Sequence, residues 1–385
     1  MIQTDKSMPL TRPVFDDQEI QSLARCLASG WVTQGPLTKK FEEQFRARHQ
    51  VSHALATTSC TAALHLSTVA LGLRAGDEVI VPAFTWVTSA HCAEYVGARA
   101  VFADVRFDTF NLDPKAFEAA ITPRTKAVVA VHLFGLSAEM DEILAIARKH
   151  SLHVIEDAAC AVGTTYDGKP VGGLGTLGCF SFHPRKVIST GEGGMVTTNR
   201  ADLASKVESL RNHGTTGLPA GDPAIGKPYG MGTFNTLGFN LRLSDIHASV
   251  GVVQMTRLDG LLAERRHLAE RYTQLLGGVE EITTPRTPAK CGHTYQSYVI
   301  RVLKGGKAKR NAVMEFLEAR KIQTRPGTHA VHRLGYYVAK YGIREEACPV
   351  AAACEDTTIT LPLFPGMTEA QQLFVVSSLK EAFKS

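Results

Sequence analysis

Seven short apolar runs alternate with helical patterns between residues 51 and 199, and this alternation limits the possible folds most. Most of the runs are continuous stretches of Val, Ile, Ala and Phe, which is typical of strands buried on both faces of a sheet. Strand–helix alternation predicts an α/β fold with a mostly parallel sheet, whose site lies at the carboxyl ends of the strands. The expected strands are Ala54–Thr58, Glu78–Pro82, Ala100–Asp104, Ala127–His132, Val154–Glu156, Cys179–Phe182 and Met195–Thr198.

The rest of the chain adds helices to this sheet and a second, smaller unit. Ser244–Leu276 has the pattern of a long helix with Ser244 as its N-cap. Strand and helix signals are mixed beyond it, so we predict a large unit at 1–250, with an N-terminal arm, and a small α+β unit at 251–385. The other expected helices are Thr61–Gly72, Ser89–Val96, Pro114–Ala120, Met140–His150, Ala312–Lys321 and Thr368–Phe383, and the later strands are Tyr298–Leu303 and Thr358–Leu361.

Composition argues against several classes of function. The 385 residues carry a net charge of only +5 and no long basic run, which does not suggest nucleic-acid binding but suits an anionic small substrate. The first residues lack the apolar stretch of a signal peptide, and we expect no membrane span. The eight cysteines show no metal-ligand spacing, so we expect reduced thiols, a cytoplasmic protein and no metal site.

The texture changes between residues 213 and 238, where seven glycines and three prolines fall in 26 residues. A loop of this length in a compact protein is either disordered or functional.

The segment Phe180–Met195 (FSFHPRKVISTGEGGM) places Lys186 between a buried strand and a glycine cluster. Because lysine is normally a surface residue, its presence here needs a reason. A covalent bond through the amine is one such reason. Burial is expected to lower the pKa of the lysine and to free a neutral amine that can form a Schiff base.

A second feature is the apolar run 154–159, which contains the paired acids Glu156 and Asp157. In pyridoxal phosphate (PLP) chemistry, a carboxylate in this place keeps the ring nitrogen protonated, so that the ring accepts carbanion electrons. A solvated or helix-capping pair is the simpler interpretation of the acids alone. Lys186, 29 residues after Asp157, favours the cofactor.

Two further strand ends carry side chains that suit a flat, phosphorylated cofactor. Thr61 opens a helix whose first N–H groups can bind phosphate, although an ordinary N-cap is the commoner use of such residues. Trp86 follows another strand and either stacks on a ring or belongs to the core.

The glycines of the run 173–178 fit the pattern GxGxxG, but their context is wrong for a dinucleotide site. That fingerprint needs a strand before it, a helix after it and an acid about 20 residues on. Here a turn precedes the run and an apolar strand follows it, so we expect a hairpin or tight turn and not a nicotinamide cofactor.

Together these motifs closely resemble the DegT/DnrJ/EryC1/StrS family. The resemblance spans nearly the whole chain and implies a PLP-dependent sugar aminotransferase of aspartate-aminotransferase fold type I. In that fold, a mostly parallel seven-stranded sheet lies between helices and a smaller α+β domain follows. The matching motifs are 156–159 (EDAA), 180–186 (FSFHPRK), 191–194 (GEGG), 30–36 (GWVTQGP), 76–82 (GDEVIVP), 121–126 (ITPRTK), 211–214 (RNHG), 238–242 (GFNLR) and 361–365 (LPLFP).

The resemblance also implies a role for each site residue. Lys186 is the Schiff-base lysine, Asp157 pairs the ring nitrogen and Trp86 stacks on the ring. Asn240 resembles the residue that reaches the phosphate of the neighbouring subunit, so a homodimer with shared sites is expected. The phosphate and its surroundings involve Cys60, Thr61, Ala62 and Ser181.

Substrate contacts follow from the same resemblance. His183 lies near the substrate or has a packing role, and Arg242 binds the carboxylate of the amino donor or forms a structural ion pair. His329 and His332 are expected to face the sugar. The chain departs from the family at Cys160, where Gln or His often contacts the 3′ oxygen of the ring, and a thiol is a weaker donor.

The resemblance implies a reaction that moves an amino group from glutamate to a keto sugar, which is expected to be linked to a nucleotide diphosphate. A sugar dehydratase of the same family is less favoured, because its lysine is typically replaced by histidine. A keto-inositol aminotransferase shares the motifs and stays open. A non-enzymatic PLP-binding regulator would often bring an extra DNA-binding segment, for which 385 residues leave no room.

Overall fold

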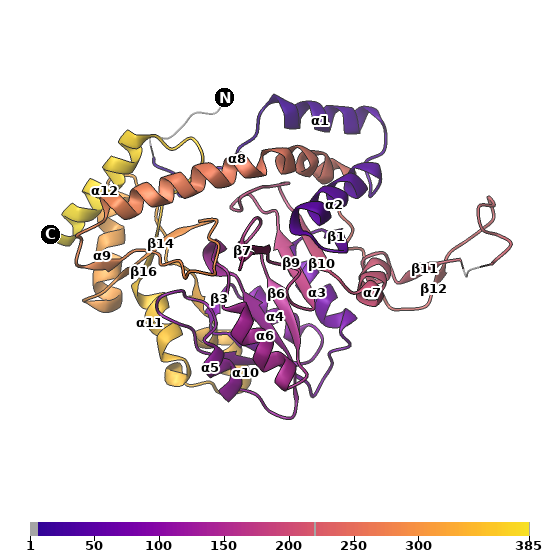
Figure 1. Ribbon diagram of the computed structural model, residues 1–385, viewed down its shortest axis with the longest axis horizontal. Coiled ribbons are helices and arrows are strands. Elements are labelled where there is room, and N and C mark those ends of the chain that lie inside the picture. Colours follow the sequence, from indigo (N-terminus) through magenta and orange to yellow (C-terminus); the bar gives the residue numbers. More distant parts are fainter. Residues whose placement is uncertain (1–6, 219–220, 385) are drawn as a thin grey trace.

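The computed structural model describes residues 7–218 and 221–384. Its centre is a seven-stranded sheet with the order β1-β10-β9-β6-β5-β2-β4 (Figure 1). The strands pair in parallel except β10, which is antiparallel to both of its neighbours. The predicted α/β sheet is therefore confirmed, and its strands are β1 (His53–Thr57), β2 (Glu78–Pro82), β4 (Arg99–Ala103), β5 (Thr125–Val131), β6 (His153–Asp157), β9 (Leu177–Ser181) and β10 (Gly194–Thr198).

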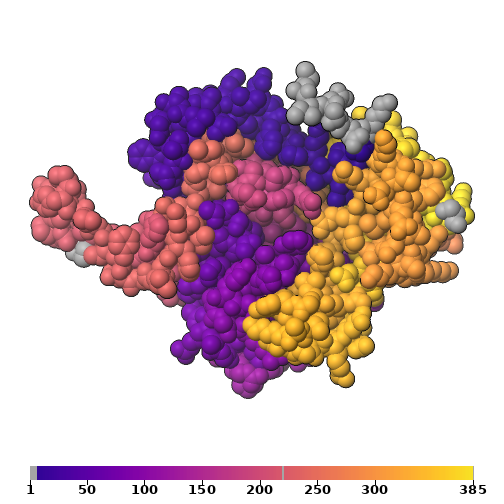
Figure 2. All heavy atoms as spheres, turned by 180° about the vertical axis from the view of Figure 1, so that it is seen from behind, coloured from indigo at the N-terminus to yellow at the C-terminus, as the bar shows by residue number. Residues whose placement is uncertain are grey.

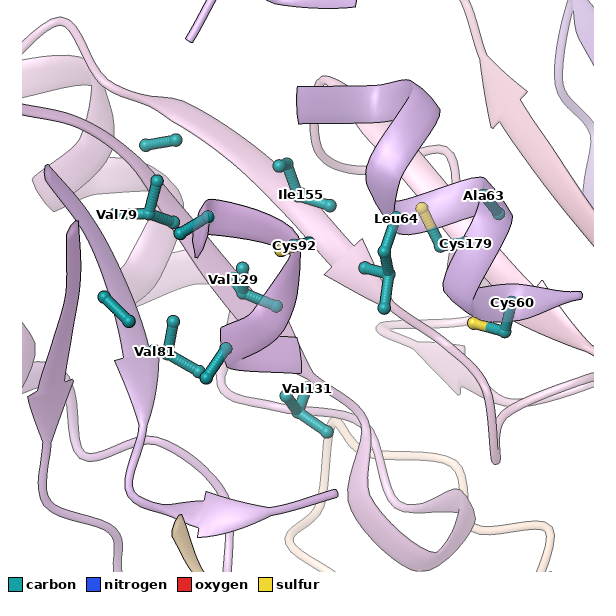
Figure 3. Close-up of a cluster of buried hydrophobic side chains, with 14 of the residues drawn as sticks. Cys60, Ala63, Leu64, Val79, Val81, Cys92, Val129, Val131, Ile155 and Cys179 are labelled. Atoms are coloured by element: carbon teal, nitrogen blue, oxygen red, sulfur yellow. The ribbon is translucent and has the colours of Figure 1, made fainter. Parts of the chain in front are cut away.

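Alternate strand residues supply two separate cores, one on each face of the sheet. Val79 and Val129 lie in the core shown in Figure 3, whereas their neighbours Ile80 and Val128 lie in the opposite one. This two-sided burial explains why the strands are apolar throughout. The first core is covered by α3 (Cys60–Ala70), α4 (Thr88–Glu94) and α7 (Ala201–Arg211), and the second by α2 (Pro36–His49), α5 (Pro114–Ala119), α6 (Met140–Lys149) and α8 (Asp245–Leu275).

The predicted long helix is confirmed as α8, which runs across the molecule in Figure 1. The Ser244 hydroxyl accepts a hydrogen bond from the His247 N–H, as expected of an N-cap. Helix α1 (Asp17–Ala28) packs on α8, where the Ser22 hydroxyl donates to the Ser249 carbonyl (2.8 Å).

The C-terminal part contains a three-stranded antiparallel sheet of β13 (Ile282–Thr283), β14 (Tyr298–Val302) and β16 (Thr358–Leu361). Helices α9 (Gly306–Ala319) and α12 (Glu369–Lys384) and the end of α8 form a third core with it. Helix α9 starts six residues before the predicted Ala312, because Gly305 at φ 83° supplies a left-handed turn into it. The predicted boundary at residue 250 falls within α8 and stays a prediction.

The remaining helices pack against the large sheet. They are α10 (Gly335–Tyr341) and α11 (Pro349–Thr357), and Tyr337 and Cys354 from them join the first core. Short two-stranded pairs complete the fold: β15 (His329–Ala330) with β3 (Phe84–Thr85), and β7 (Thr165–Tyr166) with β8 (Lys169–Pro170).

The described residues of the glycine-rich segment, 213–218 and 221–238, form a projecting arm. Its base is an antiparallel hairpin of β11 (Thr215–Gly217) and β12 (Thr233–Phe234), and Figures 1 and 2 show it extending away from the body. Large apolar side chains on this arm are exposed: Ile225, Tyr229, Met231, Phe234 and Leu237. Within the described residues, no helix is both long and apolar enough to cross a membrane.

Candidate active site

Lys186 lies in the segment that joins β9 to β10, at the carboxyl end of β9. The N–H of Phe182 donates to the Gly193 carbonyl (2.9 Å), and the N–H of Thr190 donates to the Phe182 carbonyl (3.0 Å), which closes this segment into a tight loop. The loop directs the Lys186 amine toward the end of β6, where Nζ donates to the Cys160 Sγ at 3.2 Å. Lys186 and Cys160, 26 residues apart in sequence, therefore share one site.

The charge of Lys186 is controlled by its neighbours more than by its burial. Burial alone opposes the ammonium, as expected, but Cys160, Cys60 and Asp157 favour it, and together they raise the pKa of Lys186 above its ordinary value. We expected burial to lower the pKa of Lys186 and to free a neutral amine. In the protein chain without cofactor the pKa is raised instead, so this expectation was wrong. The reason is that acidic groups surround this amine.

Asp157 ends β6 with a buried carboxylate held from two sides. The Ser89 hydroxyl donates to Oδ2 (2.6 Å), and the Ala159 N–H donates to Oδ1 (3.1 Å). The Thr85 and Ser89 hydroxyls lie 2.9 Å apart. Because Ser89 gives its only proton to Asp157, Thr85 must donate to Ser89. This chain of donors aims at the carboxylate and fixes its orientation.

Glu156, the other acid of the pair, has a structural environment. Its side chain is fully buried and accepts hydrogen bonds from the N–H groups of Gly172, Leu174 and Gly175 (2.6 to 2.8 Å). Nε2 of His132 lies 3.0 Å from it, and burial, which alone raises the pKa of Glu156, is outweighed by these partners, so the pKa is lowered. The glycine-rich run thus forms a turn around a buried carboxylate, in agreement with the expected tight turn.

The first turn of α3 forms a cradle at the same edge of the sheet. Ser59 is its N-cap, and its hydroxyl accepts the Ala62 N–H (3.1 Å). The N–H groups of Cys60 and Thr61 belong to the same first turn, which leaves donors for an anion. Gly194 of β10 lies directly against this turn, since a Cβ there would come within 2.4 Å of Ser59. Gly194 is also the register partner of Ser181, so Ser181 lies on the strand next to this glycine.

Trp86 does not belong to the core. Its side chain is 52% exposed, and its ring lies 5.7 Å from the His329 ring, centroid to centroid. Strand β15 brings His329 there by pairing with β3, where His329 is the register partner of Thr85. Trp86 also lines a cavity of about 1110 Å³.

The other predicted substrate residues are placed differently. Burial lowers the pKa of His183, whose Nδ1 accepts the Arg185 N–H (3.2 Å). His332 is fully buried, and its Nε2 lies 3.1 Å from the Glu345 carbonyl, so it offers no surface to a sugar in this structure. Arg242 Nη1 donates to Asn212 Oδ1 (2.6 Å). This contact is a hydrogen bond to a neutral amide and not the structural ion pair that was one of the two expected roles of Arg242.

Three residues near the site were not predicted from the sequence. Ser89 is one, because nothing in a helix-opening serine indicates a contact with a residue 68 positions later. Arg185 and Arg325 are the others, and both line the cavity beside Trp86. The position of Arg185, next to Lys186, is a signal that could have been used.

The residues present fit PLP. A buried amine, a buried carboxylate held by two hydrogen-bond donors, an anion cradle and an exposed aromatic ring supply a partner for each part of that molecule. Cys60 and Thr61 belong to the cradle and Ser181 lies on the neighbouring strand, while Asn240 is exposed on the surface, where a partner subunit can reach it.

Comparisons with known proteins agree with this chemistry. The model of the DegT/DnrJ/EryC1/StrS aminotransferase family matches residues 13–380. The chain is 39% identical over 371 residues to GDP-perosamine synthase of Caulobacter vibrioides, covering 96% of both proteins. It is 36% identical to the spore coat polysaccharide biosynthesis protein SpsC of Bacillus subtilis, covering 98% of this chain and 97% of SpsC.

Solved structures share the whole fold. The putative sugar aminotransferase Spr1654 from Streptococcus pneumoniae, in its PMP-form, has a TM-score of 0.93 at 28% identity, covering 98% of this chain and 99% of that one. PseC from Helicobacter pylori, an aminotransferase of pseudoaminic acid biosynthesis, has a TM-score of 0.91 at 27% identity, covering 98% and 100%. The expected fold type I is confirmed.

Proposed function

Because this chain belongs to the DegT/DnrJ/EryC1/StrS family and is a PLP-dependent sugar aminotransferase, we propose that it moves an amino group from glutamate to a nucleotide-diphosphate-linked keto sugar. The observation that carries this proposal is an intact Lys186, whose amine lies 3.2 Å from Cys160 at the end of the strand that carries Asp157. A dehydratase of this family would typically lack that lysine.

In this proposal Lys186 holds the cofactor and then works as the proton carrier. Bound PLP supplies an electron sink for a carbanion. Once free, the Lys186 amine would take a proton from the α-carbon of the bound donor and would then return a proton on the cofactor side, acting first as base and then as acid. Pairing of Asp157 with a ring nitrogen would remove one of the charges that raise the pKa of Lys186, which favours the neutral amine.

The remaining residues bind and orient. We propose that Thr61, Ala62 and Ser181, with Cys60, hold the phosphate, that Trp86 stacks on the ring and that Cys160 lies at its 3′ oxygen. We also propose that His183 and His329 contact the substrate. Arg242 stays a proposal for the donor carboxylate, although its guanidinium already donates to Asn212.

The identity of the acceptor rests on the relatives. GDP-perosamine synthase carries a nucleotide diphosphate in its name, and the chain covers 96% of that protein. In the second half-reaction the amino group would then pass to a keto-hexose that is attached to a nucleotide diphosphate. A keto-inositol is the other acceptor to be tested.

We further propose a homodimer with shared sites. Asn240 is exposed at the base of the arm, and the arm carries exposed apolar side chains, among them Met231 (82%) and Leu237 (88%). Large apolar side chains gathered on one projecting element are typical of an interaction surface. A second copy of the chain is the partner that the shared site requires.

The test follows the visible absorption band of the lysine-bound cofactor. Glutamate should convert that band to the pyridoxamine form, and keto-sugar nucleotides should restore it, whereas keto-inositol should not. Lys186→Ala should abolish both changes, while Lys149→Ala, on the exposed face of α6, should abolish neither. Turnover that survives in Lys186→Ala would show that the proposal is wrong.

A further inference from the structure

Two arginines that have no role in the proposed reaction line the cavity beside Trp86. Arg185 directly precedes Lys186, and Arg325 lies four residues before His329 in the segment that reaches Trp86. The backbone fixes Arg325 through the Thr360 N–H, which donates to its carbonyl (2.7 Å). Arg185 and Arg325, which are 140 residues apart in the sequence, therefore line one cavity of about 1110 Å³.

Neither guanidinium forms an ion pair with a residue of the described chain. The side chain of Arg325 makes one weak hydrogen bond, from Nε to the Pro326 carbonyl (3.3 Å). Burial and then the charge of Arg185 lower the pKa of Arg325, while Cys160 opposes them. Two like charges that are partly removed from water cost folding energy unless an anion joins them.

The contrast with Arg333 shows that the protein pairs its arginines elsewhere. Arg333 lies in the same segment and contacts the carboxylates of Glu345, Glu355 and Asp356. The cavity does receive two acids from α9, Glu315 and Glu318, but neither pairs with Arg185 or Arg325. The pairing partner of these two arginines is therefore missing from the described residues.

We propose that Arg185 and Arg325 form a two-guanidinium site for an oxyanion of the substrate, and that this oxyanion is the diphosphate of the acceptor. The inference rests on the proposed nucleotide-linked acceptor. Guanidinium forks bind phosphate oxygens in pairs, which suits a diphosphate. The cavity exceeds the range of about 300 to 1,000 Å³ typical of pockets for drug-sized ligands, so it has room for a nucleotide as well.

The carboxylates of the amino donor share this chemistry and are the other source of an oxyanion. Arg185 lines the cavity and directly precedes Lys186 in the chain, so a donor bound at Lys186 is the second candidate for this oxyanion. Affinity for the two kinds of anion must therefore be measured separately.

The experiment measures binding to the holoenzyme by calorimetry, with inorganic pyrophosphate in one arm and 2-oxoglutarate in the other. Arg185→Gln and Arg325→Gln should each raise the Kd of pyrophosphate about tenfold or more, and raise that of 2-oxoglutarate less. Arg320→Gln is the matched control, because it removes the same charge from α9's end, where the guanidinium is paired with Glu381. Its Kd values should match those of the unaltered protein.

Three outcomes would overturn the inference or part of it. Unchanged pyrophosphate affinity in both variants, with unaltered cofactor absorption and thermal melting, would refute the two-arginine site. A larger loss for 2-oxoglutarate would refute the diphosphate and assign the arginines to the donor. An equal loss in Arg320→Gln would show a mere effect of net charge. If no sugar nucleotide is turned over, the proposed function fails, yet the pyrophosphate arm still decides the oxyanion site.

Discussion

At the scale of single residues, Asp157 shows how a small hydroxyl sets up a reactive carboxylate. Ser89 and Thr85 are almost completely buried, and their hydroxyls form a chain that ends on Asp157 Oδ2. Ser89 is therefore a positioning residue, because it acts on the cofactor only through Asp157. Its contact is a hydrogen bond to a charged acceptor, a class that contributes about 1.5 to 3 kcal/mol.

Replacing Ser89 with Ala should weaken the binding of PLP by about tenfold, because Asp157 loses the donor that fixes its orientation. The loss should appear in a titration of the apo-protein with PLP, followed by absorbance. The pH at which the visible band changes should move as well. Ser89→Thr keeps the hydroxyl and should restore both values. Identical PLP affinity and absorbance in Ser89→Ala would contradict this role.

At the scale of elements, one carboxylate joins two helices that are far apart in sequence. Asp245, the first residue of α8, accepts hydrogen bonds from the N–H groups of Gly35, Leu37 and Thr38 (2.8 to 2.9 Å) and from the Thr38 hydroxyl (2.7 Å). It therefore caps α2, whose own N-cap Gly35 has no side chain for the purpose.

Asp245→Ala should lower the free energy of unfolding by about 3 kcal/mol or more, because the first turn of α2 loses a buried, charged acceptor. Asp245→Asn should cost less, since one oxygen remains. Urea denaturation of the holoenzyme measures the loss. The control is Asp259→Asn, an 83% exposed acid of α8, for which at most about 1 kcal/mol is expected. Equal losses in both positions would contradict the capping role.

The elements also show what the sequence could and could not predict. Strand ends were found to within about two residues, because two-sided burial leaves continuous apolar runs. Helix α2 was not predicted, since its cap comes from Asp245, more than 200 positions later. For the same reason Lys186 and Asp157 could be named from local motifs, whereas Ser89 and Arg325 reach the site only through the packing of distant segments.

At the scale of the whole molecule, buried neutral histidines make stability depend on pH. His49 lies between the rings of Phe45 and Phe180, and its Nδ1 donates to the Val171 carbonyl (2.9 Å). Burial lowers its pKa from 6.5 to about 4. Between these values the unfolded chain binds a proton that the folded chain does not, so stability rises with pH in this window and falls as the pH drops.

Between pH 6.5 and pH 4, the folded protein should lose about 3 kcal/mol of its free energy of unfolding through His49. His49→Phe should therefore show a shallower decline of the free energy of unfolding over that window, whatever its stability at neutral pH. Urea denaturation at several pH values measures the slope. His267→Gln, at an exposed position of α8, should keep the original slope. An unchanged slope in His49→Phe would contradict the assignment.

A shared active site makes a prediction that only the assembled dimer can test. Lys186→Ala and Asn240→Ala should each be inactive or nearly so, but in a mixed dimer one site receives Lys186 from one chain and Asn240 from the other. Random exchange makes half of the dimers mixed, so about a quarter of all sites become complete and activity should recover to that level.

Mixing Lys186→Ala with Asp157→Ala is the matched control. Both residues come from the same chain, whose β6 and β9 are neighbouring strands, so no mixed site is complete. Recovery in the control would contradict the single-chain origin of that pair, and absence of recovery with Asn240→Ala, in dimers shown to have exchanged, would contradict a site completed across the interface.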